Sequence, residues 1–400
     1  MTLKKLSQGE FIALIAMLFA TIAFSIDAML PALPEIAAAY SPDAPNRAQL
    51  VVTSFVFGMG AGTLFAGPIS DAFGRKPTIM VGAAIYCLGA ALAAVAPSLE
   101  WLLAARVLQG LGAAGPRVVS LAMVRDLYQG REMARVMSFA MMIFTLVPAV
   151  APLAGTGIIA VAGWHGIFIA FIAFSVLSML WLGLRQPETL PAGARRALEA
   201  GPLLHALREV LSNRLVVTAI AVQTLCLSCL FGTISSTQQI FDTSFGRAES
   251  FPLWFALIAL MSGSASFVNA RVVVRLGMRL LVSWTLRIQI GLSAVFAALM
   301  WQGLLPAPLD FAAYVIWTTS VFMLAGMTLG NLNALAMEPL GHIAGMAASV
   351  SGAVSTVLAV GLAVPLGLAF DGTPVPLAFG ILVLVCLGAA LMASLPKRTV

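Results

Sequence analysis

The chain has 400 residues, of which 60% are apolar and only 10% charged, and its mean hydropathy is +1.00. Soluble globular domains contain about 45–50% apolar and about 25% charged residues. This composition therefore excludes a soluble enzyme. The sequence also contains no phosphate-binding loop of the GxxxxGK[ST] type, no nucleophile elbow and no cluster of metal-ligating residues.

Long apolar stretches recur along the whole chain. A helix that spans a bilayer needs about 20 such residues, and the sequence offers about twelve stretches of this length. We interpret the first as a membrane helix and not as a signal peptide, because further spans follow it. The spans are predicted at residues 10–31, 48–69, 77–96, 99–124, 134–160, 164–184, 214–236, 251–270, 280–300, 310–336, 343–367 and 376–395.

The basic residues predict the orientation of these spans. With the N-terminus inside, 17 of the 22 Lys and Arg residues fall on inner ends or loops. Only Arg47 and Arg247 fall outside, and Arg106, Arg117 and Arg287 lie within spans. Basic residues collect on the cytoplasmic side of membrane proteins. We therefore expect both termini in the cytoplasm and interpret the net charge of +6 as a topology signal, not as a sign of nucleic-acid binding.

A charged turn separates the second and third predicted spans. It reads Gly-Pro-Ile-Ser-Asp-Ala-Phe-Gly-Arg-Lys-Pro over residues 67–77 and includes Gly67, Asp71, Gly74 and Arg75. One acid and two bases cannot lie in hydrocarbon, so we predict a short aqueous loop. A decayed copy follows 203 residues later, if Gly74 is aligned with Gly277, and Val274 then replaces the acid. Such internal duplication is typical of transporters.

The copy divides the chain into two halves with similar organisation. We predict six-helix bundles over residues 1–184 and 214–400, with a cytoplasmic linker over 185–213. Within the linker, Leu204, Leu207 and Leu211 recur at helical spacing, which predicts a short helix on the membrane surface.

These motifs resemble the major facilitator superfamily over essentially the whole chain. The turn at 67–77 is similar to its signature loop between helices 2 and 3, and residues 106–115 resemble a helix 4 motif of its drug:proton antiporters. Pro148, Pro152 and Gly155 stand where antiporters have a motif that kinks helix 5, although part of the usual glycine run is missing. Residues 27–34, 125–128 and 344–349 resemble the bicyclomycin/chloramphenicol resistance (Bcr/CflA) branch. The resemblance implies twelve transmembrane helices in two pseudo-symmetric bundles. It also implies that Asp71 steadies the outward-facing state through the N-terminus of helix 11.

Three ionisable residues within spans are candidates for the chemistry. A charge in hydrocarbon costs at least about 2.5–3.5 kcal/mol, so such a residue is functional by default. Asp27 in helix 1 and Arg106 in helix 4 are predicted at similar depth. One hypothesis is an ion pair that a proton releases. The alternatives are a static pair that locks the two helices and a capping role of Asp27 beside the water of the outer loop. Arg117 lies about 16 Å deeper on nearly the same face. It either meets an anionic or electron-rich substrate group or extends to inner-face water.

Polar stripes predict the wall of a substrate cavity. On helix 7, Thr224 and Ser228 share a face, and on helix 10 so do Trp317, Thr328 and Asn331. The family resemblance implies that helices 1, 4, 7 and 10 line a central cavity. Met141 and Phe144 of helix 5 offer an adaptable apolar surface, although core packing explains such residues equally well.

The sequence therefore favours a proton-coupled exporter of amphipathic drugs or metabolites. The alternatives are an exporter of one dedicated metabolite or siderophore, an importer or facilitator on the same fold, and a membrane-embedded enzyme or receptor. We expect no cofactor, since the proton gradient would drive transport. The expected partners are a small amphipathic substrate, protons and the lipid bilayer, with no nucleic acid, and we expect a monomer in the bacterial inner membrane.

Overall fold

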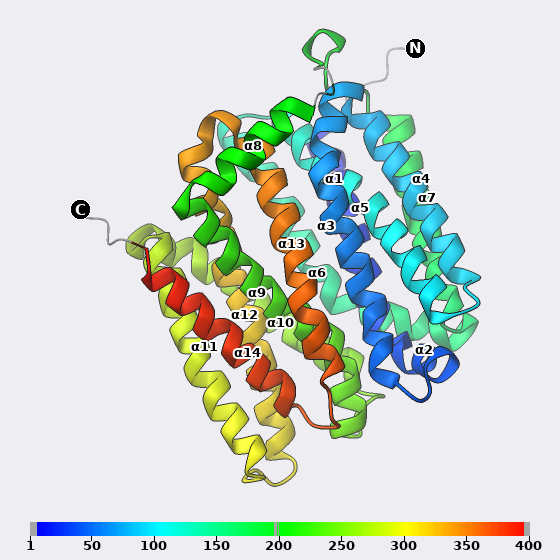
Figure 1. Ribbon diagram of the computed structural model, residues 1–400. Helices are drawn as coiled ribbons and strands as arrows, with labels where there is room; N and C mark the ends of the chain where they lie inside the picture. Colours follow the sequence, from blue (N-terminus) through cyan, green and yellow to red (C-terminus); the bar gives the residue numbers. More distant parts are fainter. Residues whose placement is uncertain (1–5, 196–197, 199, 396–400) are drawn as a thin grey trace. The chain divides into compact units, whose positions relative to one another are not determined.

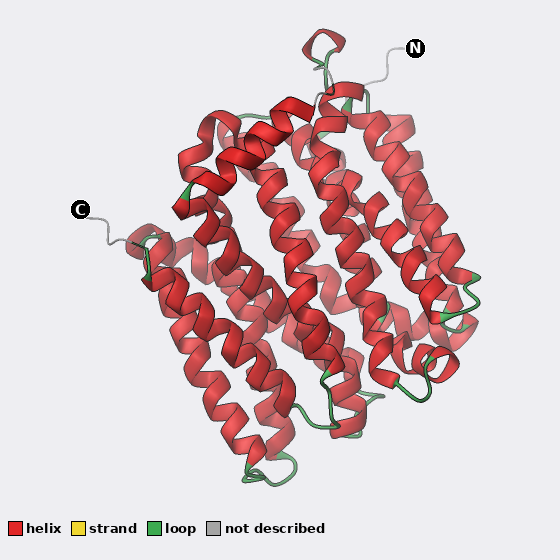
Figure 2. Ribbon diagram, in the orientation of Figure 1, coloured by secondary structure: helices red, strands yellow, loops and turns green. Residues whose placement is uncertain are grey.

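The computed structural model describes residues 6–195, 198 and 200–395, and the described part of the chain is helical without strands (Figures 1 and 2). Five basic residues that contribute to the charge sorting lie outside the described ranges: Lys4, Lys5, Arg196, Lys397 and Arg398. Contacts divide the chain into two compact units, residues 1–203 and 204–400, with the border inside a short helix, α8 (Ala200–Ser212). That helix is the one predicted within the linker.

Unit 1 contains six long helices and one short one. The long helices are α1 (Gln8–Asp27), α3 (Leu50–Phe73), α4 (Arg75–Ala94), α5 (Leu99–Leu127), α6 (Gly130–Ala162) and α7 (His165–Arg185). The first predicted span continues past α1 through a 3₁₀ turn (Leu30–Ala32) into the short helix α2 (Leu33–Tyr40). Pro31 and Pro34 explain this break, since proline removes a backbone donor and clashes with the preceding turn.

Unit 2 contains the six remaining long helices. These are α9 (Arg214–Gln239), α10 (Phe251–Leu276), α11 (Met278–Trp301), α12 (Leu309–Met337), α13 (Ala344–Leu368) and α14 (Val375–Ala393). Only a 3₁₀ segment (Glu338–Ile343) separates α12 from α13. Because the helical run from Leu309 to Leu368 is continuous, the described residues contain eleven helical runs that are long and apolar enough to cross a membrane. The all-helical membrane fold predicted from the sequence is confirmed.

The two units share one scheme of helix neighbours. In unit 1, α5 packs on α3 and α4, α1 packs on α6, and α4 packs on α7 (Figure 1). In unit 2, α12 packs on α10 and α11, α9 packs on α13, and α11 packs on α14. Each unit 2 pair repeats the unit 1 pair at the corresponding position in chain order, which agrees with an internal duplication.

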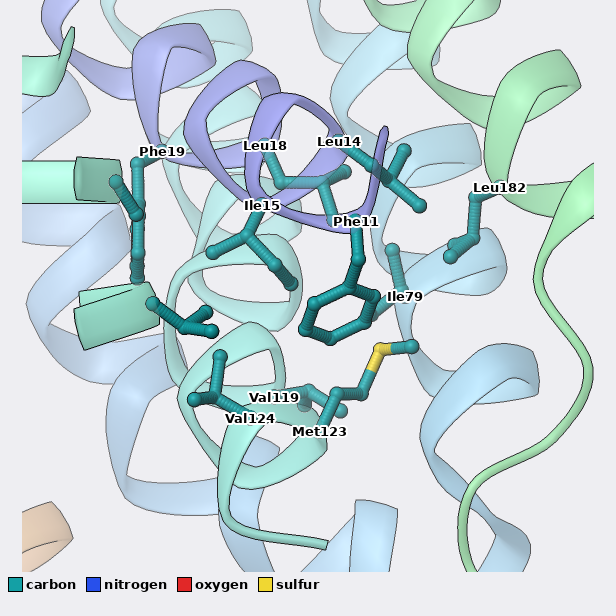
Figure 3. Packing of buried hydrophobic residues seen from close by; sticks show 12 residues of the cluster. Phe11, Leu14, Ile15, Leu18, Phe19, Ile79, Val119, Met123, Val124 and Leu182 are labelled. Atoms are coloured by element: carbon teal, nitrogen blue, oxygen red, sulfur yellow. The ribbon is translucent and has the colours of Figure 1, made fainter. Parts of the chain in front are cut away.

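The apolar core of unit 1 lies where α1 meets α5 and α6. Side chains from these helices interdigitate with one residue each from α4 and α7 (Figure 3). The cluster comprises Phe11, Leu14, Ile15, Leu18, Phe19, Ile79, Val119, Met123, Val124, Val136, Ala140 and Leu182. This packing fixes α1 against α5 and so sets the height of Asp27 and Arg106 within one unit.

The charged turn is shorter than predicted. The sequence predicted an aqueous loop from Gly67 to residue 77, but α3 continues through Asp71 to Phe73 and α4 begins at Arg75. Gly74 alone makes the turn, at φ +107° and ψ 159°. Only glycine adopts this backbone region readily, and a single residue there is enough to reverse the chain between two helices.

Candidate functional site

Arg106 is completely buried, about two turns after the start of α5. Its guanidinium donates to the carbonyl of Val51 on α3 (3.1 Å), to the carbonyl of Ser25 on α1 (3.0 Å) and to Oε1 of Gln109 (2.6 Å). It also lies over the Phe55 ring, 4.4 Å from the centroid. Ser25 is in the last turn of α1, where carbonyls lack helical partners. The positive charge is therefore held by backbone dipoles, an amide and an aromatic face.

A tyrosine from α4 extends this polar network. The Ser25 hydroxyl donates to the Thr21 carbonyl (2.6 Å), and its oxygen is 2.5 Å from the hydroxyl of Tyr86. Both Ser25 and Tyr86 are buried. The network thus joins α1, α3, α4 and α5. One polar atom in it, Nε2 of Gln109, is buried without a hydrogen-bond partner.

Asp27 is the last residue of α1 and is 4% exposed. No side chain or backbone group of the described residues forms a hydrogen bond or ion pair with its carboxylate. The hypothesis of an ion pair between Asp27 and Arg106 is therefore wrong for this structure. The physical reason is that Arg106 already has its acceptors, including a carbonyl two residues before Asp27. The acid and the base are linked through the backbone of α1.

Arg117 lies farther along α5 and differs from Arg106 in being exposed. Its one recorded polar contact is between NH1 and the sulfur of Met59 on α3, at 3.7 Å. The substrate contact of Arg117 stays a prediction.

The residues predicted on the fifth span occupy different surroundings. Pro148 is half-buried, whereas Pro152 and Gly155 are buried in α6. A Cβ at Gly155 would lie 2.3 Å from the carbonyl oxygen of Ala28, so the absence of a side chain lets α6 pack directly on the end of α1. Met141 is 38% exposed. The ring of Phe144 is half-buried and meets the Phe19 ring edge-on, with centroids 6.3 Å apart.

A second polar cluster lies where α3 ends, α4 begins and α5 ends. Arg75 donates to the carboxylate of Asp71, to the hydroxyl of Ser70 (2.7 Å) and to Oδ2 of Asp126 at the end of α5 (3.0 Å). The Arg75 side chain is only 10% exposed. Asp71 is 44% exposed and pairs with Arg75 one turn along. Its predicted contact with helix 11 involves the other unit and stays a prediction.

Glu188 belongs to this cluster, and sequence analysis missed it. Its carboxylate accepts the backbone N–H groups of Arg75 and Lys76 (3.0 Å each) and of Thr189 and Leu190 (2.9 Å each). The first two are orphan donors at the N-terminus of α4. The signal was present, since an acid directly after a membrane helix is a potential cap, but the sequence does not say which helix it caps. Residues 186–190, predicted as linker, thus belong to unit 1.

The residues of the polar stripes predicted in unit 2 are buried, and their hydrogen bonds go to different partners. Thr224 and Ser228 bond carbonyls of their own helix, as does Thr328. Trp317 donates to Ser293 of α11 (3.1 Å), whereas Asn331 donates to Asn269 of α10 (2.7 Å). Trp317 and Asn331 therefore bond to different neighbouring helices. Their contact with substrate stays a prediction.

Comparison with known proteins assigns the family. The model described as Major Facilitator Superfamily matches residues 13–365. The chain belongs to the major facilitator superfamily. It is 30% identical to the uncharacterized MFS-type transporter YdgK of Bacillus subtilis over 380 residues, covering 94% of this chain and 92% of that protein. It is 29% identical to the bicyclomycin resistance protein homolog of Haemophilus influenzae, covering 83% and 82%.

A solved transporter structure shares the fold. A crystal structure of a D-xylose-proton symporter superposes with a TM-score of 0.77 at 14% identity, covering 98% of this chain and 99% of the symporter. The protein is thus a multi-pass membrane transporter and not an enzyme. The resemblance to the drug-resistance branch is confirmed by the bicyclomycin-resistance relative.

Proposed function

We propose that this transporter exports small amphipathic compounds in exchange for protons across the inner membrane of a bacterium. Two relatives are bacterial transport or resistance proteins, and one bears bicyclomycin resistance in its name. The distribution of basic residues supports cytoplasmic termini, which would place the Arg75–Glu188 cluster on the cytoplasmic side. The transporter would act as a monomer. It would need no cofactor, because the proton gradient supplies the driving force.

The observation that carries the proposal is the position of Asp27 beside the Arg106 network. A buried carboxylate without a partner is costly when charged. Asp27 is buried in this way at the end of α1, two residues after the carbonyl that Arg106 holds. A proton bound at Asp27 removes this cost, whereas its release requires new surroundings for the charge. Such a dependence is what couples protonation to a change between two conformations.

Arg106 supplies the mechanical part of this coupling. Its guanidinium fixes the last turn of α1 to α3 and α5 through the carbonyls of Ser25 and Val51. A movement of α1 relative to α3 and α5 that gives Asp27 access to water must therefore stretch or break a bond to Arg106. The planar fork bonds two helices at once, which a lysine ammonium cannot reproduce with the same geometry.

The test is gradient-driven transport of bicyclomycin into inverted membrane vesicles from a host without its own drug exporters. Asp27→Asn keeps the size of the side chain and resembles the protonated acid. We expect it to lower gradient-driven transport at least tenfold while membrane insertion stays normal. Arg106→Lys should retain part of the activity and Arg106→Ala almost none.

The matched control is Asp43→Asn, the same change at an exposed residue outside the network. It should transport like the wild type. Full gradient-driven transport by Asp27→Asn would refute the assignment of Asp27. Movement of bicyclomycin in the same direction as the protons would identify a symporter and reject export by exchange.

A further inference from the structure

The two arginines of α5 are held in opposite ways. Arg106 is fully buried and bonds three acceptors. Arg117 follows eleven residues later, which brings it back to within about 20° of the same helix face. Yet Arg117 is exposed, and its one recorded polar contact is with the sulfur of Met59. The second arginine therefore keeps most of its donors available.

The depth of Arg117 makes this exposure informative. Helix α5 runs from Leu99 to Leu127, so Arg117 stands about 6 Å past its midpoint and about 15 Å before its end. The arginine stem spans less than half of that remaining distance and cannot carry the charge to the end of the helix. A charge at this depth costs at least about 2.5–3.5 kcal/mol unless water or a ligand reaches it.

Three neighbours of Arg117 on its own helix are buried. Ala113, Ala114 and Ser120, one turn away on either side, are all at most 1% exposed. The exposure of Arg117 therefore contrasts with the packed helix surface around it. In the described part of the chain no acid forms an ion pair with it.

The chemistry of this arrangement selects a ligand. A guanidinium offers five N–H donors in a plane and matches carboxylate, sulfonate or phosphate groups with two parallel bonds. The thioether of Met59, the recorded contact of Arg117, is polarizable and packs well against aromatic rings. A compound with an anionic group and an apolar or aromatic body would satisfy both residues, whereas a cation would be repelled.

We propose that Arg117 binds the anionic group of the transported compound and makes this transporter selective for amphipathic anions over cations of the same size. This inference rests on the proposed export function for its biological meaning, but it concerns equilibrium binding. It assigns the selectivity to one side chain. A change of charge at that position should therefore change the order of preference and not simply weaken all ligands equally.

The experiment uses two probes of the same shape and opposite charge, tetraphenylborate and tetraphenylphosphonium. Their dissociation constants for the purified full-length transporter are measured by isothermal titration without a proton gradient. The ratio of the two constants is compared between wild type and variants, which cancels the unequal partitioning of the ions into detergent. We expect Arg117→Gln to shift this ratio at least tenfold toward the cation, and Arg117→Lys to keep most of the wild-type ratio.

The matched control is Arg287→Gln. Arg287 is an exposed arginine within α11, and its guanidinium lies 5.8 Å from the centre of the Trp284 ring. It should leave the ratio unchanged. An unchanged ratio in Arg117→Gln, with a normal gel-filtration profile, would overturn the proposal, as would an equal shift in the control. The ratio of the two dissociation constants does not depend on proton coupling. If Asp27→Asn loses export but keeps the wild-type ratio, the defect lies in the transport mechanism and not in the selectivity of Arg117.

Discussion

The α3–α4 turn passes through Gly74 at φ +107° and ψ 159°, and the α10–α11 turn passes through Gly277 at φ +78° and ψ 155°. Both glycines are followed at once by a new helix. Their surroundings differ. A Cβ on Gly74 would lie 2.6 Å from Oε2 of Glu188, whereas a Cβ on Gly277 would meet nothing within 4 Å.

The charged residues around the two turns also differ. In unit 1 the turn holds Arg75 between Asp71 and Asp126. In unit 2 the position of Asp71 is taken by Val274, which is 84% exposed, and Arg271 stacks on the Phe267 ring at 4.1 Å. The backbone turn thus persists without the acids, so glycine alone is sufficient to make it. The acids and the Glu188 cap of unit 1 must serve another purpose, which we expect to be control of the conformational cycle.

The largest effect should come from alanine at the two glycines. Backbone strain in this region costs about 1–3 kcal/mol for a residue with a Cβ, and both Gly74→Ala and Gly277→Ala carry it. Only Gly74→Ala also drives a methyl group into Glu188. We expect both variants to lower the midpoint of thermal unfolding in detergent, with the larger loss for Gly74→Ala.

The double variant Gly74→Ala/Glu188→Ala isolates the steric part. The double variant should lose less stability than the sum of the losses in Gly74→Ala and Glu188→Ala, because the new methyl group then has no carboxylate to meet. Strictly additive losses in the double variant, together with equal losses in Gly74→Ala and Gly277→Ala, would show that the Glu188 contact is unimportant and that only backbone strain matters.

An intermediate effect is expected from Glu188→Gln. The amide keeps one oxygen acceptor but loses the charge and the second acceptor, while four N–H groups still point at it. Losing a helix cap of this kind costs about 0.5–2 kcal/mol. Hydrogen exchange at the Arg75 and Lys76 amides should become faster, and amides at the start of α11 should not change. Unchanged exchange at Arg75 and Lys76 would contradict the capping role.

The same comparison shows how far the sequence alone could lead. The spans and the internal duplication follow from hydropathy and from one repeated glycine motif, because both are local signals. The partners of Arg106, Glu188 and Trp317 could not be predicted, since they depend on how neighbouring helices are rotated. The Asp27–Arg106 hypothesis failed for that reason. Similar depth in two helices says nothing about which acceptor the guanidinium reaches first.

The smallest effect should come from exchanging the acidic feature between the two turns. Val274→Asp with Met278→Arg rebuilds in unit 2 the i,i+4 pair that Asp71 and Arg75 form in unit 1. Position 274 is exposed, so the new pair should contribute only about 0.3–0.5 kcal/mol. Asp71→Asn removes the charge from one partner of Arg75 but leaves an amide oxygen as an acceptor, and the Arg75 side chain, which is 10% exposed, keeps Asp126 and Ser70. We expect the Asp71→Asn variant to unfold at nearly the same midpoint as the wild type but to transport more slowly. The substrate concentration that gives half of the maximal rate should not change. Labelling of engineered cysteines on the two sides of the membrane should shift in Asp71→Asn and stay the same in the unit 2 variant. If both variants shifted the labelling alike, the two turns would be equivalent in function despite their different surroundings.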